Sequence, residues 1–228
     1  MSGTIVALGG LSADHDDSPL RHFIVDAAQK SKPRICYVPL ASGDYDVFVS
    51  LFYDQYTPSF CRPSHLELLR KVTHDPAEVL AAQDIVYLGG GSTPVLVAAM
   101  RVLGLDRVLR AVLQRGGVLC GDSAGAHVWF KGCITDSLGP DLHVFPDGLG
   151  LAEGTCVAHY DHERAAMLET ALVAGELPGP AWGIEDGAAV ALRGGRLEAV
   201  SARDYGGVHE LTVQGNGVQV EPLNVRRL

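Results

Sequence analysis

Short apolar runs alternate with amphipathic stretches along the first half of the chain. The runs are bounded by glycine, proline or polar residues, as buried strands are, and the stretches between them carry apolar residues at helical spacing. The expected strands cover residues 4–8, 33–40, 64–69, 84–88 and 117–121. The expected helices cover residues 19–30, 76–83, 92–103 and 106–114. This alternation predicts a three-layer α/β fold with a mostly parallel central sheet and helices on both faces.

The pattern changes after about residue 181, where short apolar runs follow one another directly. Glycine-rich turns such as RGGR and QGNG separate them, which is typical of antiparallel strands. These runs cover residues 188–192, 196–200, 209–213 and 217–220. We expect these C-terminal antiparallel strands to extend or cap the sheet. No repeat or linker divides the chain, so we expect a single domain over residues 1–228.

Composition and charge argue against several kinds of partner. The 228 residues carry a net charge of −9, which disfavours nucleic acid and anionic membranes. No apolar run is long enough to span a bilayer, and the N-terminus enters a strand directly, without a signal peptide, so we expect a cytoplasmic protein. The five cysteines are scattered and do not have the spacing of a zinc site, and we expect neither a metal nor another cofactor. Apolar strands in the C-terminal part are compatible with a homo-oligomer.

Three conspicuous segments directly follow expected strands. They are GGGST at residues 89–93, GDSAG at residues 121–125 and AHYDHE at residues 158–163. Because open α/β sheets place their ligands at the carboxyl ends of the strands, the three segments are expected to meet at one edge.

Ser123 stands where a strand turns sharply into a helix. GDSAG fits the G-x-S-x-G elbow, in which small neighbours allow a strained turn that exposes the serine hydroxyl. Serine also caps helices, and this is the alternative interpretation. As a nucleophile, Ser123 would have the amide of Ala124 beside it for an oxyanion, and Gly90 or Gly91 could offer a second amide.

The best general base in the sequence is His159, which ends the apolar run 155–158. His162 is the alternative base. His127 lies one helical turn after Ser123 and could line the site, as could Thr93, at the start of the helix after the glycines.

A base of this kind needs a carboxylate to orient it. We favour Glu185, which follows the apolar run 182–184, and keep Asp136 as its main rival. Further candidates are Asp186, Asp161 and Glu153.

Together these motifs resemble the serine peptidase family of aspartyl dipeptidase (peptidase E) and cyanophycinase. GGGST is similar to the family's GGGNT loop, GDSAGAH to its elbow, AHYDHE to its histidine segment, and GIEDGAAV to its acidic segment. The resemblance spans nearly the whole chain and implies a fold like that of class I glutamine amidotransferases.

The resemblance implies a serine peptidase that hydrolyses short peptides, as a dipeptidase or an aminopeptidase, through an acyl-enzyme. It implies Ser123 as nucleophile, His159 as base and Glu185 as the third member. Aspartyl dipeptidases recognise an Asp side chain, for which a cation is needed. Here Arg164 is the candidate, and it is equally interpretable as a residue of the helix surface.

Three other interpretations remain open. An esterase of the α/β-hydrolase fold would use Asp136 or Glu153 as acid and His209 as base, in the order Ser, acid, His. A cysteine enzyme would use Cys120, although its place inside a strand favours a buried thiol. A non-catalytic small-ligand binding protein could retain the same fold.

Overall fold

The computed structural model of the protein describes residues 3–11, 17–70 and 74–228. Its larger sheet has the strand order β14-β11-β10-β1-β5-β4-β2-β3. The strands are β1 (Thr4–Leu8), β2 (Arg34–Val38), β3 (Arg62–His65), β4 (Ile85–Leu88), β5 (Val118–Asp122), β10 (Ala188–Arg193), β11 (Arg196–Ser201) and β14 (Val225–Arg227). Neighbours from β1 to β3 run parallel, whereas β10 is antiparallel to both β1 and β11.

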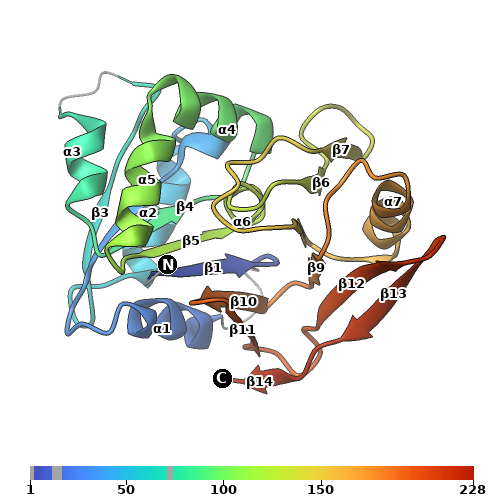
Figure 1. Ribbon diagram of the computed structural model, residues 1–228. Coiled ribbons are helices and arrows are strands. Elements are labelled where there is room, and N and C mark those ends of the chain that lie inside the picture. The colour runs from blue at the N-terminus through green and yellow to red at the C-terminus, as the bar shows by residue number, and fades with distance from the viewer. Residues whose placement is uncertain (1–2, 12–16, 71–73) are drawn as a thin grey trace.

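Helices cover both faces of this sheet (Figure 1). On one face lie α1 (Ser18–Ala27) and α2 (Asp46–Gln55), and on the other α3 (Pro76–Ala81), α4 (Thr93–Val102) and α5 (Leu105–Gln114). Side chains of β1 alternate between the two cores: Val6 and Leu8 pack under α1 and α2, and Ile5 and Ala7 under α3 to α5. A central strand buried on both faces explains why the sequence there is uninterruptedly apolar.

A smaller sheet stands beside the larger one, with the order β13-β12-β9-β8 (Figure 1). It consists of β8 (Thr155–Ala158), β9 (Ala181–Ile184), β12 (Val208–Gln214) and β13 (Gly217–Pro222). The helix α7 (His162–Val173) packs against it through Leu168, Ala171 and Leu172. A two-stranded ribbon, β6 (Cys133–Thr135) with β7 (His143–Phe145), lies next to α7.

The predicted fold class is confirmed: the sheet is mostly parallel, both faces carry helices, and the C-terminal strands are antiparallel. Those C-terminal strands divide between the two sheets, since β10 and β11 extend the larger one and β12 and β13 belong to the smaller one. The helix α2 was not predicted. Within the described residues, no helix has the length and apolar character needed to cross a membrane.

Candidate active site

Ser123 occupies a strained turn between β5 and the short helix α6 (Ala124–His127). Its backbone has φ 52° and ψ −116°, a conformation that residues other than glycine rarely adopt and that costs about 1–3 kcal/mol. The turn is tight as well, because a Cβ on Gly125 would lie 1.9 Å from the carbonyl oxygen of Leu88. The Ser123 side chain makes no capping hydrogen bond to α6. The elbow interpretation therefore fits this geometry better than the helix-cap interpretation.

His159 follows β8 and is held by a carboxylate. Its Nδ1 lies 2.7 Å from Oδ1 of Asp186. A carboxylate oxygen accepts, so Nδ1 carries the proton and donates it, and the lone pair on Nε2 is left available. The His159 side chain is 37% exposed and that of Asp186 50%. An imidazole oriented in this way can accept a proton from a serine hydroxyl.

The carboxylate bonded to His159 is that of Asp186, whereas the sequence favoured Glu185 for this place. Glu185 turns to the other side, where its Oε1 accepts from His209 Nε2 at 2.8 Å and its Oε2 accepts from the amide of Gly207 at 3.0 Å. Asp186 is the second residue of the turn that the Glu185 carbonyl oxygen closes with the amide of Ala188 at 3.1 Å, so the two neighbouring side chains leave the backbone in different directions. Asp186 was among the sequence candidates, but nothing in the sequence ranked it above Glu185.

The rival acids are also engaged elsewhere. Asp136 accepts from Nη2 of Arg164 at 3.0 Å, and Glu153 is paired with Lys131. His209, the base of the esterase interpretation, is therefore bonded to neither of the two acids that this interpretation needs. The alternative base His162 is the first residue of α7.

The Cys120 thiol is fully buried within β5. Burial raises its pKa well above the ordinary value, so the reactive thiolate is disfavoured. This environment is that of a core thiol rather than a nucleophile.

The end of β1 links the three catalytic candidates, and sequence reasoning missed it. Successive carbonyl oxygens of Leu8, Gly9 and Gly10 accept from the backbone amides of Ser123, His159 and Gly187, at 3.4, 2.9 and 2.9 Å. Gly187 directly follows Asp186 in the chain. The turn after β1 therefore fixes the backbone of the nucleophile, the base and the acid.

Both glycines of this turn are required by space. A Cβ on Gly10 would lie 2.2 Å from Asp186 Oδ1 and 2.4 Å from His159 Cε1, and one on Gly9 would lie 2.1 Å from a backbone oxygen. The available signal was the pair of glycines directly after the first strand, which is the same signal that identified GGGST.

The glycine loop, residues 89–91, passes beside Ser123. A Cβ on Gly90 would come within 3.4 Å of Ser123 Cβ, and Gly91 has φ 135° and lies against the backbone of Ala41. Ala124 begins α6, where the first amides of a helix have no acceptor within the helix. The glycine loop and the start of α6 thus lie next to Ser123, where their amides are candidate donors to an oxyanion.

His127 and Thr93, expected to contact substrate, are buried and bonded to each other. Nδ1 of His127 lies 3.2 Å from Thr93 Oγ1, while its Nε2 accepts from the amide of Ala158 at 2.9 Å. Burial lowers the pKa of His127 to about 3, so the ring is neutral. In this arrangement both residues connect α4, α6 and β8 and do not face an open surface.

Arg164 is also engaged by neighbouring side chains. Its guanidinium donates to Asp161 Oδ2 at 3.1 Å and to Asp136 Oδ2 at 3.0 Å, and 15% of the side chain is exposed. Two carboxylates therefore surround one cation.

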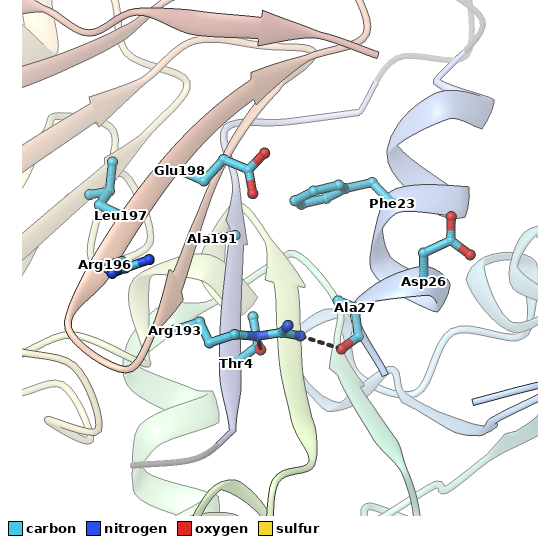
Figure 2. A pocket seen from close by; sticks show the side chains of 9 residues that line it. All are labelled: Thr4, Phe23, Asp26, Ala27, Ala191, Arg193, Arg196, Leu197 and Glu198. Carbon is cyan, nitrogen blue, oxygen red and sulfur yellow. Dashed lines mark hydrogen bonds between the residues drawn. The ribbon is translucent and has the colours of Figure 1, made fainter. Parts of the chain in front are cut away.

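A pocket of about 420 Å³ lies at the opposite end of the sheet, between α1 and the β10–β11 hairpin (Figure 2). Its walls include Phe23, Arg196 and Glu198, and Arg193 is held there by Thr4 Oγ1 and the Ala27 carbonyl. Thr4 begins β1, whereas the catalytic candidates surround its other end, so this pocket is separate from them. Among the described residues, no group of three or more His, Cys, Asp or Glu side chains is arranged to hold a metal ion.

Comparison with known proteins agrees with the motifs. The model of peptidase family S51 matches residues 5–200. The uncharacterized peptidase YgaJ of Bacillus subtilis (strain 168) is 32% identical over 230 residues, covering 98% of each chain.

Two solved structures share the fold. One is a peptidase from an acI-B1 Actinobacterium, with a TM-score of 0.76 and 19% identity, covering 99% of this chain and 95% of that one. The other is a putative peptidase E protein from Listeria monocytogenes EGD-e, with a TM-score of 0.64 and 15% identity, covering 86% of this chain and 97% of that one.

Proposed function

Since the chain belongs to peptidase family S51, we propose that it is a serine peptidase that hydrolyses short peptides through an acyl-enzyme on Ser123. His159 acts as general base and acid, and Asp186 orients it. The observation that carries the proposal is the set of three hydrogen bonds at the end of β1, which gathers the backbone of Ser123, His159 and the residue after Asp186 around one turn.

In the proposed reaction, Nε2 of His159 takes the proton of the Ser123 hydroxyl while Oγ attacks the peptide carbonyl carbon. The carbonyl oxygen becomes an oxyanion, which backbone amides of Ala124 and of the glycine loop stabilise. Loss of one such donor typically costs about 10²–10³ in turnover. The protonated His159 then gives its proton to the leaving amine. Water hydrolyses the acyl-enzyme with the same residues in reversed roles, which regenerates Ser123.

We propose that the enzyme does not select for Asp. The surroundings of Arg164 support this proposal, because Asp136 and Asp161 already neutralise the guanidinium and leave an excess of negative charge. A substrate carboxylate would have to displace one of these pairs and would be repelled by the other. Dipeptides and N-terminal residues with uncharged side chains are therefore the substrate class we expect. A cytoplasmic location, a homo-oligomer and a single domain stay predictions of the sequence.

The test measures amine release from Asp-Leu, Ala-Leu and leucine anilide by the purified protein and by Ser123→Ala. We expect release from Ala-Leu and from the anilide, and a loss of about 10⁴-fold or more in kcat for the variant. The variant should unfold at the same temperature as the wild type. Activity of Ser123→Ala close to wild type would overturn the assignment of the nucleophile.

The matched variant Arg164→Ala tests the specificity. If Arg164 is neutralised as described, its removal should leave the ratio of Asp-Leu to Ala-Leu hydrolysis unchanged. Release from Asp-Leu alone, lost in Arg164→Ala, would show instead that Arg164 binds the substrate carboxylate.

A further inference from the structure

A second carboxylate lies directly beside the nucleophile and has no part in the reaction as described so far. Asp122 is the last residue of β5, immediately before Ser123. A Cβ on Gly90 would lie 2.9 Å from Asp122 Oδ2, so this carboxylate is packed against the backbone of the glycine loop. The Tyr87 hydroxyl, the backbone amide of Gly90 and the His159 ring all lie close enough to the carboxylate to lower its pKa.

Each residue of the glycine loop rests on a different neighbour. A Cβ on Gly89 would lie 2.3 Å from the Tyr37 hydroxyl, and one on Gly91 would lie 2.2 Å from the carbonyl oxygen of Ala41. Of the three contacts, the one at Gly90 is made by an ionisable side chain that belongs to the elbow itself. Asp122 is therefore the connection between the loop and the nucleophile.

We propose that Asp122 is a positioning residue that fixes the glycine loop relative to Ser123 and so sets the geometry of the oxyanion hole. This inference rests on the proposed serine-peptidase function. Gly90 lies against both Asp122 and Ser123, so a shift of this carboxylate would move the amides of the glycine loop relative to that of Ala124.

The surroundings of Asp122 disfavour its charged form, yet polar and charged neighbours are placed around its carboxylate. Burial raises its pKa, and the donors on Tyr87 and Gly90 and the nearby His159 oppose that rise. The titratable groups around it are Tyr87 on β4, Tyr37 on β2, Tyr56 after α2, Cys120 on β5 and His159 after β8. A half-buried acid with polar and charged neighbours of this kind is more typical of a functional region than of a general core.

The test compares the wild type with Asp122→Asn, which keeps the shape and removes the charge, and with Tyr87→Phe, which removes one donor. We expect Asp122→Asn to lower kcat about 10- to 100-fold through a displaced oxyanion hole, with KM little changed. Inactivation by a serine-directed fluorophosphonate should slow by a similar factor, because the phosphonyl oxygen uses the same amides. Tyr87→Phe should show a smaller change of the same kind.

The acid limb of the pH dependence of kcat/KM provides a readout that a purely structural role would not move. Removing the negative charge beside His159 makes its protonated form less favourable, so the limb should move to lower pH in Asp122→Asn. The control is Asp147→Asn, which removes a carboxylate from the exposed pair with Arg101 and should change neither kcat nor the profile.

Each outcome bears on a different claim. If the wild type neither hydrolyses peptides nor reacts with the fluorophosphonate, the proposed function fails and the inference with it. If the wild type is active and Asp122→Asn matches it in kcat, phosphonylation and pH profile, the inference alone is overturned. Should Asp122→Asn unfold, Tyr87→Phe decides: unchanged kcat and phosphonylation in a folded Tyr87→Phe would overturn the role of this contact.

Discussion

The exchange Asp186→Asn tests the assignment of the acid most directly. An amide has the shape of the carboxylate but no charge, and it can present its NH₂ group to Nδ1 of His159. Nδ1 would then accept, Nε2 would carry the proton, and the imidazole could no longer act as a base toward Ser123. The change therefore removes both the charge that stabilises the imidazolium and the tautomer that the reaction needs.

The size of the effect follows from the exposure of the pair. Two unit charges about 4 Å apart interact with about 1 kcal/mol in water and about 4 kcal/mol at the effective dielectric constant of a protein surface. The His159 and Asp186 side chains are 37% and 50% exposed, so the interaction lies between these limits. That range corresponds to about 5- to 10³-fold in rate, and the wrong tautomer adds to it. We expect kcat/KM to fall about 10²–10³-fold, less than the roughly 10⁴-fold for a buried triad aspartate.

The neighbouring Glu185→Gln is the matched control. Glu185 contacts His209 and Gly207, and its exchange should leave kcat/KM within about threefold of wild type, in the range of changes remote from the reacting groups. Both variants are assayed on the same peptide, with phosphonylation of Ser123 as the second measurement. A large loss in Glu185→Gln with an active Asp186→Asn would refute the argument and return the role to Glu185.

Two further predictions concern the surroundings of the site. Gly10→Ala should lower kcat about 10²-fold or more in a peptidase assay, because the added Cβ would separate His159 from Asp186. The control Gly217→Ala should leave kcat unchanged, since a Cβ has space there. An active Gly10→Ala would contradict the packing described for this turn. Burial lowers the pKa of His127 in the folded protein to about 3, from an ordinary value of 6.5. Between pH 3 and pH 6.5 the unfolded chain therefore binds more protons at this residue than the folded protein does. The free energy of unfolding should fall as the pH drops from 6.5 towards 3. The free energy of unfolding, measured in urea at pH 5 and pH 7, should change by up to about 1.4 kcal/mol per pH unit in the wild type and by less in His127→Gln. An equal change in the two proteins would contradict a neutral buried ring.

The short strands β6, β7 and β14 were not predicted, and β3 begins and ends earlier than the expected strand at residues 64–69. Most other strands and helices could be predicted because their sequences repeat one signal. The helix α2 could not, because its exposed side also carries apolar residues. Val47, Phe48 and Leu51 are 56%, 44% and 48% exposed, while Phe52 is buried. Apolar residues on both sides remove the periodicity from which a helix is recognised.

The choice between Glu185 and Asp186 shows where sequence reasoning ends. Both follow the same strand, both are carboxylates, and the turn that follows decides which one faces His159. That turn depends on Gly187, with φ 78°, and on the hydrogen bond that the Gly187 amide donates to the carbonyl oxygen of Gly10, a residue 177 positions earlier in the chain. A contact over that distance leaves no local trace in the sequence. The three loops were correctly expected to follow strands, but the strand of His159 lies in the smaller sheet and not in the central one.

The direction of the strands next to β1 explains how one turn can still gather all three residues. β5 is parallel to β1, so its carboxyl end, which carries Ser123, lies beside the carboxyl end of β1, with Leu8 opposite Asp122. β10 is antiparallel, so its beginning lies at that same end, with Leu8 opposite Ala189. Asp186 comes just before β10 and therefore arrives from the other side. A parallel strand in the place of β10 would have put its preceding acid at the far end of the sheet. The reversed strand thus brings the acid to the nucleophile, and Gly9 and Gly10 leave the space into which His159 enters from the smaller sheet.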